Sequence, residues 1–228
     1  MKTGNKGFLI LITFLTIATA IFLTGCRGKS ANVKQAAAEE TLQQDSLSIF
    51  NGRTLDGWEV TNFGTQGPVD VSGGKIYLGM GDGCTGITYL KEVPEIDYEV
   101  TLEAMRVEGN DFFCGMTFPV GKDPCTLIIG GWGGSVVGLS SIDGKDASEN
   151  ETTRYMQFEK NRWYKIKLKV TKEKIEAWID NEKVVDFTIN GKKLSIRPEV
   201  ELSKPFGIAS WRTTAALRNI RVQSIAKE

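Results

Sequence analysis

The sequence KIKLKVTKEKIEAWIDNEKVVDF, residues 165–187, establishes the fold class of this chain. Its first six residues alternate strictly, with Ile166, Leu168 and Val170 separated by lysines. A period of two places the apolar side chains on one face of a strand and the lysines on the other. Turn-forming residues at 171–173 and 180–181 divide the remainder into two further segments. The sequence therefore predicts three consecutive antiparallel strands, each with one buried face.

Short alternating segments of this kind recur along the chain after Ser46. No stretch there keeps an apolar period of 3.6 residues, so no long amphipathic helix is expected. Many short strands separated by glycine and Asn/Asp turns are typical of an all-β jelly-roll sandwich of two antiparallel sheets. The further strands are predicted at residues 97–107, 112–118, 125–129, 135–141, 206–211 and 215–225.

The N-terminal segment has the pattern of a lipoprotein signal peptide. Lys2 and Lys6 precede residues 8–23, which carry no charge, and this run ends in Leu23-Thr24-Gly25-Cys26. A basic start, an apolar run and small residues before a cysteine predict cleavage before Cys26 and attachment of a lipid to its sulfur. The alternative is a plain transmembrane anchor, although this run is shorter than the roughly 20 residues that span a bilayer.

The chain is thus predicted to have three parts. They are a signal peptide at 1–25, a lipidated cysteine and polar flexible tether at 26–46, and a single domain at 47–228. The lipid would anchor the domain to a membrane outside the cytoplasm. In a cell with two membranes, Arg27 after the cysteine indicates the outer membrane, on its periplasmic or surface face.

Composition excludes several classes of function. The chain has 28 basic and 28 acidic residues, and removal of two lysines with the signal peptide leaves a net charge of about −2. Without a basic excess, nucleic acid is not an expected partner. The chain contains no histidine, which excludes histidine-dependent catalytic triads and histidine-ligated zinc. Catalysis would have to use carboxylates, Lys, Tyr, Arg or a metal bound by oxygen, and no organic cofactor is expected.

Three cysteines fall in the predicted domain: Cys84, Cys114 and Cys125. An odd number leaves at least one thiol unpaired. Two neighbouring strands could join Cys114 to Cys125 in a disulfide. The alternative, which we favour, is that all three are buried free thiols.

Several motifs of the domain resemble one known family. They are FNGRTLDGW at 50–58, DYEV at 97–100, RWYKI at 162–166, WIDNEKVV at 178–185, FGIA at 206–209 and LRNIRV at 217–222. In this order and spacing they resemble the 3-keto-disaccharide hydrolase domains, also described as 3-keto-glucoside lyase/hydratases. The resemblance spans essentially the whole mature domain. It implies a concanavalin A-like jelly roll, a lipoprotein setting and processing of oxidised sugars.

The reaction that the resemblance implies is an elimination followed by hydration. A ketone at C3 of a sugar acidifies the C2 proton, so a base can remove it, the C1 substituent leaves, and water adds to the enone. Such a site needs a carboxylate or similar base and a positive group for the enolate. The chain departs from the pattern of catalytic members, since Pro119 replaces an arginine, glycines and Trp132 replace acids at 128–134, and histidine is absent. The resemblance therefore predicts the fold better than the mechanism.

Two tryptophans are candidate platforms for a sugar ring. Trp132 lies in the glycine-rich stretch 130–138, where glycines allow a ligand or another backbone to approach closely. The alternative is a bulged, buried strand whose tryptophan belongs to the core. Trp211 beside Arg212 would combine a flat ring with a hydrogen-bonding guanidinium, and core packing of the ring is again the alternative.

A polar loop at residues 143–154 could supply catalytic groups. Asp143 or Glu151 would act as the base, Arg154 or Arg212 would stabilise the enolate, and Asn150 would bind the sugar. The same loop could hold a calcium ion through its oxygens, although it lacks the EF-hand pattern. A solvated connection between strands is the third interpretation.

The run EIDYE at 95–99 suggests a rival enzyme class. The spacing of Glu95, Asp97 and Glu99 resembles the catalytic strand of family 16 glycoside hydrolases. A period of two would place the three acids on one face of a strand, where a retaining hydrolase needs paired carboxylates. Pro94 marks a strand start, however, which favours an ordinary framework strand.

Two main functions from different classes remain open. The first is an extracytoplasmic enzyme that acts on a 3-keto-glycoside by elimination and hydration. The second is a non-catalytic carbohydrate-binding or surface-interaction module. The missing family acids and histidine favour binding, and the acidic loop favours catalysis. Both the enzyme and a carbohydrate-binding module would bind a carbohydrate on one hollowed face of the sandwich.

Overall fold

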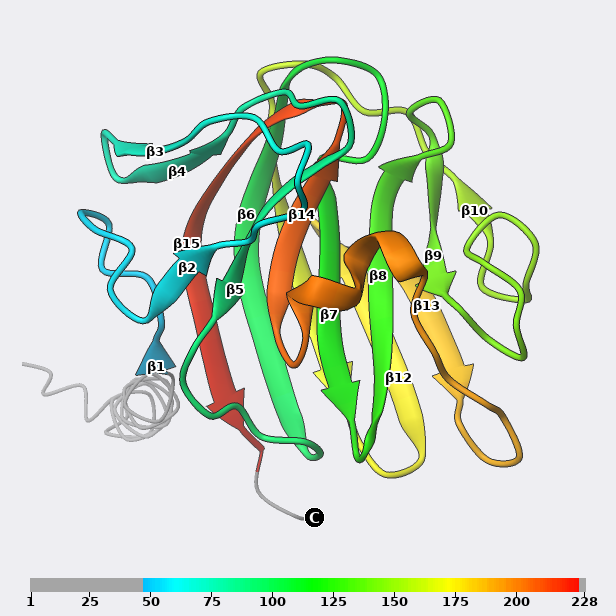
Figure 1. Cartoon of the computed structure of the whole chain (residues 1–228). Helices are drawn as coiled ribbons and strands as arrows, with labels where there is room; N and C mark the ends of the chain where they lie inside the picture. Colours follow the sequence, from blue (N-terminus) through cyan, green and yellow to red (C-terminus); the bar gives the residue numbers. More distant parts are fainter. Residues whose placement is uncertain (1–46, 226–228) are drawn as a thin grey trace, which may run out of the picture. The chain divides into compact units, whose positions relative to one another are not determined.

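The computed structural model describes residues 47–225, which form two antiparallel β-sheets packed face to face (Figure 1). This confirms the predicted all-β sandwich for that part of the chain. The predicted signal peptide at 1–25, the lipidated Cys26 and the tether up to residue 46 lie outside the described residues. Within residues 47–225, no helix is long and apolar enough to cross a membrane.

The first sheet, sheet A, has the strand order β13-β12-β11-β6-β15-β4-β3, with β1 paired to β15. Residues 165–187 lie in β11, β12 and β13, which are consecutive antiparallel neighbours as predicted. Ile166, Leu168 and Val170 are buried between the sheets, and each contributes roughly 1.5–3 kcal/mol by leaving water. The strands of sheet A are β1 (Leu47–Ser48), β3 (Val69–Ser72), β4 (Lys75–Leu78), β6 (Tyr98–Glu108), β11 (Trp163–Val170), β12 (Lys174–Ile179), β13 (Glu182–Thr188) and β15 (Thr214–Ser224).

The second sheet, sheet B, has the strand order β10-β9-β8-β7-β14-β5-β2. A short 3-10 helix, η1 (Pro198–Ser203), lies across its outer face (Figure 1). Glycine at position 207 permits this contact, because a Cβ there would lie 2.7 Å from the Ser203 carbonyl oxygen. The strands of sheet B are β2 (Trp58–Val60), β5 (Cys84–Tyr89), β7 (Cys114–Val120), β8 (Asp123–Gly131), β9 (Val136–Ser140), β10 (Arg154–Tyr155) and β14 (Gly207–Trp211).

Sheet B places large side chains on its inner face and small ones on its outer face. Along β8, Cys125, Leu127 and Ile129 join the main core, while Thr126 and Ile128 alternate with them on the outside. The same alternation on neighbouring strands leaves mostly small outer residues, namely Cys84, Gly86, Thr88, Gly115, Thr117, Gly138, Ser140, Gly207 and Ala209. Small side chains cannot fill the space above the sheet, so this face is hollowed.

The strands predicted outside residues 165–187 correspond to β6, β7, β8, β9, β14 and β15, with ends shifted by one or two residues. Strand β5 was not predicted, because all six of its residues are buried and the polar-apolar alternation is lost. Its inner side meets the core and its outer side lies near η1, where Thr88 Oγ1 donates to the Leu202 carbonyl oxygen at 3.0 Å. Five short strands and one helix were also not predicted. They are β1, β2, β3, β4, β10 and η1.

The three cysteines of the domain are buried free thiols, as favoured above. Cys114 lies opposite Ile129 and Cys125 lies opposite Phe118, so the two are four positions apart on the β7–β8 ladder. At about 3.3 Å per residue, that separation exceeds the roughly 4.4–6.8 Å between Cα atoms that a disulfide needs. The alternative of a Cys114–Cys125 bridge is therefore wrong. Burial raises the pKa of each thiol to about 12.

A buried arginine joins the two sheets at one end of the sandwich. Arg106 lies on β6 of sheet A and is only 5% exposed. Its Nη2 donates to the carbonyl oxygen of Gly130 at the end of β8, at 3.1 Å, and to that of Gly134 in the turn before β9, at 2.9 Å. The guanidinium also lies over the rings of Phe113 and Phe158. Desolvation lowers the pKa of Arg106, and these contacts offset part of the cost of burying its charge.

We predict that R106M lowers the free energy of unfolding by about 2–4 kcal/mol, because the two carbonyl oxygens lose their buried donor. Urea denaturation of the domain measures the change. R162M is the matched control, since the Arg162–Asp180 pair is exposed and should contribute at most about 1 kcal/mol. Equal losses in the two variants would contradict the role of Arg106 as a link between the sheets.

Candidate functional site

The outer face of sheet B carries a cavity of about 240 Å³. The buried side chains of Thr126 and Ser140 form its floor, and η1 borders one side. Larger residues at these two floor positions would fill the space. The residues that line the cavity are Cys84, Asp111, Phe112, Thr126, Ile128, Trp132, Ser140, Arg197, Glu199, Val200 and Trp211.

Two of the predicted sugar-platform residues flank this cavity. Trp132 follows a bulge at Gly130, where the register of β8 and β9 shifts, and its backbone φ is +47°. The predicted bulge is confirmed, but the alternative that Trp132 belongs to the core is wrong, because the turn presents the ring outward at 40% exposure. Trp211 ends β14 and is half-buried against Cys84 and Val200. The fold thus brings together two rings that are 79 positions apart in the sequence.

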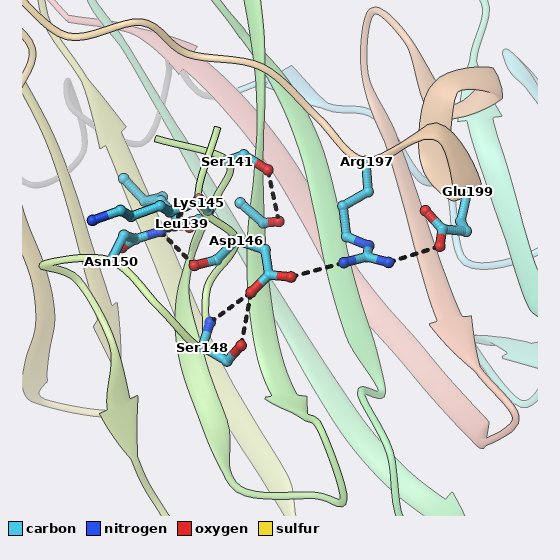
Figure 2. Close-up of polar contacts among 9 residues, drawn as sticks. Leu139, Ser141, Lys145, Asp146, Ser148, Asn150, Arg197 and Glu199 are labelled. Atoms are coloured by element: carbon cyan, nitrogen blue, oxygen red, sulfur yellow. Dashed lines mark hydrogen bonds and ion pairs between the residues drawn. The ribbon is translucent and has the colours of Figure 1, made fainter. Parts of the chain in front are cut away.

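Three charged residues that the sequence did not single out also line the cavity: Asp111, Arg197 and Glu199. Arg197 reaches between two carboxylates, with Nη1 2.7 Å from Asp146 Oδ2 and Nη2 2.8 Å from Glu199 Oε1 (Figure 2). The hydrogen bond from Arg197 holds the pKa of Glu199 below its ordinary value of 4.5. The guanidinium also lies 6.0 Å from the centre of the Trp132 ring. Arg197 and Glu199 therefore form a charged wall beside the ring at neutral pH.

Asp111 fixes the opposite rim of the cavity to the Trp132 turn. Its Oδ1 accepts a hydrogen bond from the Phe112 N–H at 2.7 Å, and its Oδ2 accepts a longer one from the Gly133 N–H at 3.4 Å. The backbone N–H of Asp111 donates to Thr213 Oγ1 at 3.1 Å. The carboxylate is thus held next to Trp132 by bonds from Phe112 and Gly133, while the Thr213 hydroxyl holds the backbone of Asp111.

Asn150, predicted to bind the sugar, holds its own loop together (Figure 2). Its Nδ2 donates to the carbonyl oxygens of Leu139 and Asp146 at 2.7 and 2.8 Å, and to that of Lys145 at 3.2 Å. Its Oδ1 accepts from the N–H and hydroxyl of Thr152. Because these bonds occupy the amide, the geometry gives no support to a sugar-binding role for Asn150.

The predicted catalytic residues do not line the cavity. Asp143 and Glu151 both pair with Lys192, at 3.2 and 2.7 Å. The hydrogen bond from Lys192 lowers the pKa of Glu151, and a backbone bond from Lys193 is the main cause that lowers the pKa of Asp143. Arg154 lies on β10, the edge strand of sheet B. Their catalytic roles stay predictions that the cavity does not support.

The calcium site considered for the 143–154 loop has no ready set of ligands. Within residues 47–225, no group of three or more acidic or cysteine side chains could hold a metal ion. Three of the four acids of the loop are instead paired with cations, Asp143 and Glu151 with Lys192, and Asp146 with Arg197. The calcium hypothesis therefore gains no support from this loop.

Arg212 lies beside Trp211 without lining the cavity. Its Cζ is 5.8 Å from the centre of the ring, and its Nε donates to the Asp82 carbonyl oxygen at 2.9 Å. The predicted pairing of a flat ring with a guanidinium is therefore present, but this guanidinium is turned toward the backbone. Its role in substrate binding or enolate stabilisation stays a prediction.

The acids of the EIDYE run do not share one face of a strand. Strand β6 begins at Tyr98, and Asp97 has a φ of +54°, which breaks the alternation before the strand starts. Glu95 forms an exposed pair with Lys122, and Glu99 accepts from Gln223 across sheet A. The predicted arrangement of three acids on one face is wrong, and none of them lines the cavity.

Arg197 and Glu199 were not predicted as site residues, because η1 was not predicted. Pro198 at the first helical position is a recognised signal for a helix start. That signal could have located the helix, but nothing in the local sequence indicates that the helix lies on sheet B. Asp111 likewise sits in the turn sequence Gly109-Asn110-Asp111, which indicates only a turn.

Three solved structures share this fold at low sequence identity. Crh5 transglycosylase in complex with NAG matches with a TM-score of 0.55 and 15% identity, covering 80% of this chain and 85% of that one. Carbohydrate-binding module CBM66 from Bacillus subtilis matches with 0.52 and 16%, covering 74% and 96%. Laminarinase from Flavobacterium sp. UMI-01 matches with 0.51 and 14%, covering 78% and 98%. These likenesses show a concanavalin A-like sandwich and no more. No curated protein matches the sequence.

The family is shown by the sequence itself. The profile of the 3-keto-alpha-glucoside-1,2-lyase-like domain matches residues 45–223, which covers nearly the whole described sandwich. This confirms the resemblance carried by the motifs from FNGRTLDGW at 50–58 to LRNIRV at 217–222. The chain therefore belongs to the family of 3-keto-alpha-glucoside-1,2-lyase-like domains.

Proposed function

We propose that this protein binds a glycoside in the cavity on the outer face of sheet B. The observation that carries the proposal is that Trp132 and Trp211 flank one hollow whose walls also hold Asp111, Arg197 and Glu199. Indole faces pack against the apolar faces of a pyranose, and a few placed polar groups then fix its orientation. Proteins named as a carbohydrate-binding module and a laminarinase share this fold, which supports a carbohydrate ligand.

The size of the cavity favours a single sugar ring. Pockets for drug-sized molecules measure roughly 300–1,000 Å³, and this one measures about 240 Å³. Phe112, Ile128 and Val200 give it apolar walls, and Thr126 and Ser140 give it a floor that bears hydroxyl groups. We therefore expect one residue of an oligosaccharide, or a simple glycoside, to occupy it.

Replacing either tryptophan should weaken glycan binding. W132A and W211A are each expected to raise the Kd about tenfold or more, because each removes one aromatic face of the cavity. Titration calorimetry with a glycan identified on an array measures the change. W163A is the matched control, since Trp163 lies on β11 of sheet A against Arg218. Unchanged binding in both cavity variants, or an equal loss in W163A, would contradict the proposed site.

Family membership favours a second candidate function in the same cavity, the elimination and hydration of a 3-keto-glycoside or oxidised disaccharide. Asp111 is the carboxylate that we assign to removal of the C2 proton, and Arg197 is the cation that would stabilise the enolate. We do not assign this role to Glu199, because Arg197 donates to its Oε1 and lowers its pKa. Binding comes first in our proposal because Arg197 already bridges two carboxylates and the chain has no histidine.

A chromogenic 3-keto-glucoside tests this second candidate. Release of the chromophore should fall at least about 100-fold in D111N, the loss expected on removal of a general base. D143N and E151Q, which change the predicted loop acids, should release it at the rate of the unaltered protein. No release by the unaltered protein, together with saturable glycan binding, would eliminate the enzyme. Loss in E151Q alone would return the catalytic role to the 143–154 loop.

We also propose that Cys26 carries a lipid and that the domain works outside the cytoplasm, at the outer membrane where the cell has two. The support is the sequence pattern at residues 1–27. Cells grown with labelled palmitate should incorporate label into the unaltered chain, and C26A should lose the label and leave the membrane fraction. Equal labelling of C26A would contradict lipidation at this cysteine.

A further inference from the structure

The charges on the cavity wall are unbalanced toward the negative. Among the described residues that line it, Asp111 and Glu199 are acidic and Arg197 is the one cation. Asp146 adds a third carboxylate against Arg197, 2.7 Å from its Nη1. A ligand in this cavity therefore meets more negative than positive charge.

The cation on the wall is already committed to these acids. Both terminal nitrogens of Arg197 hold a carboxylate oxygen, at 2.7 Å for Asp146 and 2.8 Å for Glu199. Asp146 is itself fixed by Ser148, whose hydroxyl and N–H donate to Oδ1 at 2.7 and 3.2 Å (Figure 2). Arg197 has further N–H groups, but a carboxylate on a sugar would share this one cation with Asp146 and Glu199 and lie beside these acids. Arg212 does not line the cavity, and its Nε donates to the Asp82 carbonyl oxygen.

The two acids on the wall retain the capacity to accept further hydrogen bonds. An ionised carboxylate has about four lone-pair sites, and the bonds from Phe112, Gly133 and Arg197 use only part of this capacity on Asp111 and Glu199. An ammonium group has three donors and no acceptor, which matches such a wall. The tryptophan faces beside the acids also attract a cation.

Resting on the proposed glycoside function, we infer that this cavity selects sugars that carry a free amino group and discriminates against acidic sugars. The ammonium of an amino sugar pairs with Glu199 or Asp111 while the ring lies against Trp132 or Trp211. The N-acetyl form of the same sugar loses the charge and adds an acetyl group, while the glucoside, with a hydroxyl in place of the amine, keeps the shape and loses the charge. The carboxylate of a uronic acid meets the two acids, and the one cation that lines the cavity is already paired with two carboxylates.

Calorimetry with four methyl glycosides tests the inference, namely those of glucosamine, N-acetylglucosamine, glucose and glucuronic acid. The buffer is slightly acidic and low in salt, where the amine is protonated and exposed charges are weakly screened. The glucosaminide should bind about five- to tenfold tighter than its N-acetyl form, the effect expected of one charge-assisted contact. The glucuronide should bind about tenfold weaker than the glucoside.

Variants on η1 separate the charge effect from a change of fold. In E199Q the ratio of the Kd of the N-acetyl form to that of the glucosaminide should fall toward one. The ratio of the Kd of the glucuronide to that of the glucoside should fall as well. E201Q removes the same charge from the same helix, at a residue that pairs with Lys204 and does not line the cavity. It should keep both preferences.

The outcomes distinguish this inference from the proposed function. Equal affinity for the glucosaminide and its N-acetyl form, or tightest binding of the glucuronide, overturns the charge selection. If the glucoside binds and W132A abolishes this binding, the proposed glycoside site is still supported. No binding of any of the four glycosides, with none on a glycan array, overturns both.

Discussion

The fold and the site both depend on the alternation of side chains along the strands of sheet B. Inward residues such as Leu127 and Ile129 fill the core, while outward residues such as Thr126 and Ser140 are too small to fill the space above the sheet. A slip of one residue in register would exchange the two sets. The core and the cavity would then be lost together, so one constraint supports both the stability of the domain and the cavity.

Two segments turn the hollowed face into a cavity with walls. The first is η1, which lies close to the sheet and carries Glu199, with Arg197 just before its first turn. The second is the end of β8 with the turn that follows it. There, two buried hydrogen bonds from Arg106 hold Gly130 and Gly134 and so fix the position of Trp132. Because Arg106 belongs to sheet A, the packing of the two sheets also decides where the ring of Trp132 lies.

The cavity combines the scaffold of a lyase-like family with polar groups that suit recognition. Asp111 and the Arg197–Glu199 wall are fixed by neighbouring residues, and the shortest of these contacts are charge-assisted. In the proposed function, this preorganised wall receives the hydroxyl and amino groups of a sugar. The loop that holds Asp143, Asn150 and Glu151 instead uses its polar atoms to fold itself and to pair with Lys192.

The sequence by itself determined the fold class, the β11–β13 meander and the family, because a period of two and an ordered set of motifs are local signals. It also marked Trp132 and Trp211, since glycines around an aromatic and an aromatic beside an arginine are visible in a single stretch. Only the tertiary structure decided that these rings share a cavity with Asp111, Arg197 and Glu199. Those five residues come from two turns, the end of β14 and the start of η1. The tertiary structure brings them together through the packing of the sheets and the position of η1 across sheet B, which no local pattern encodes.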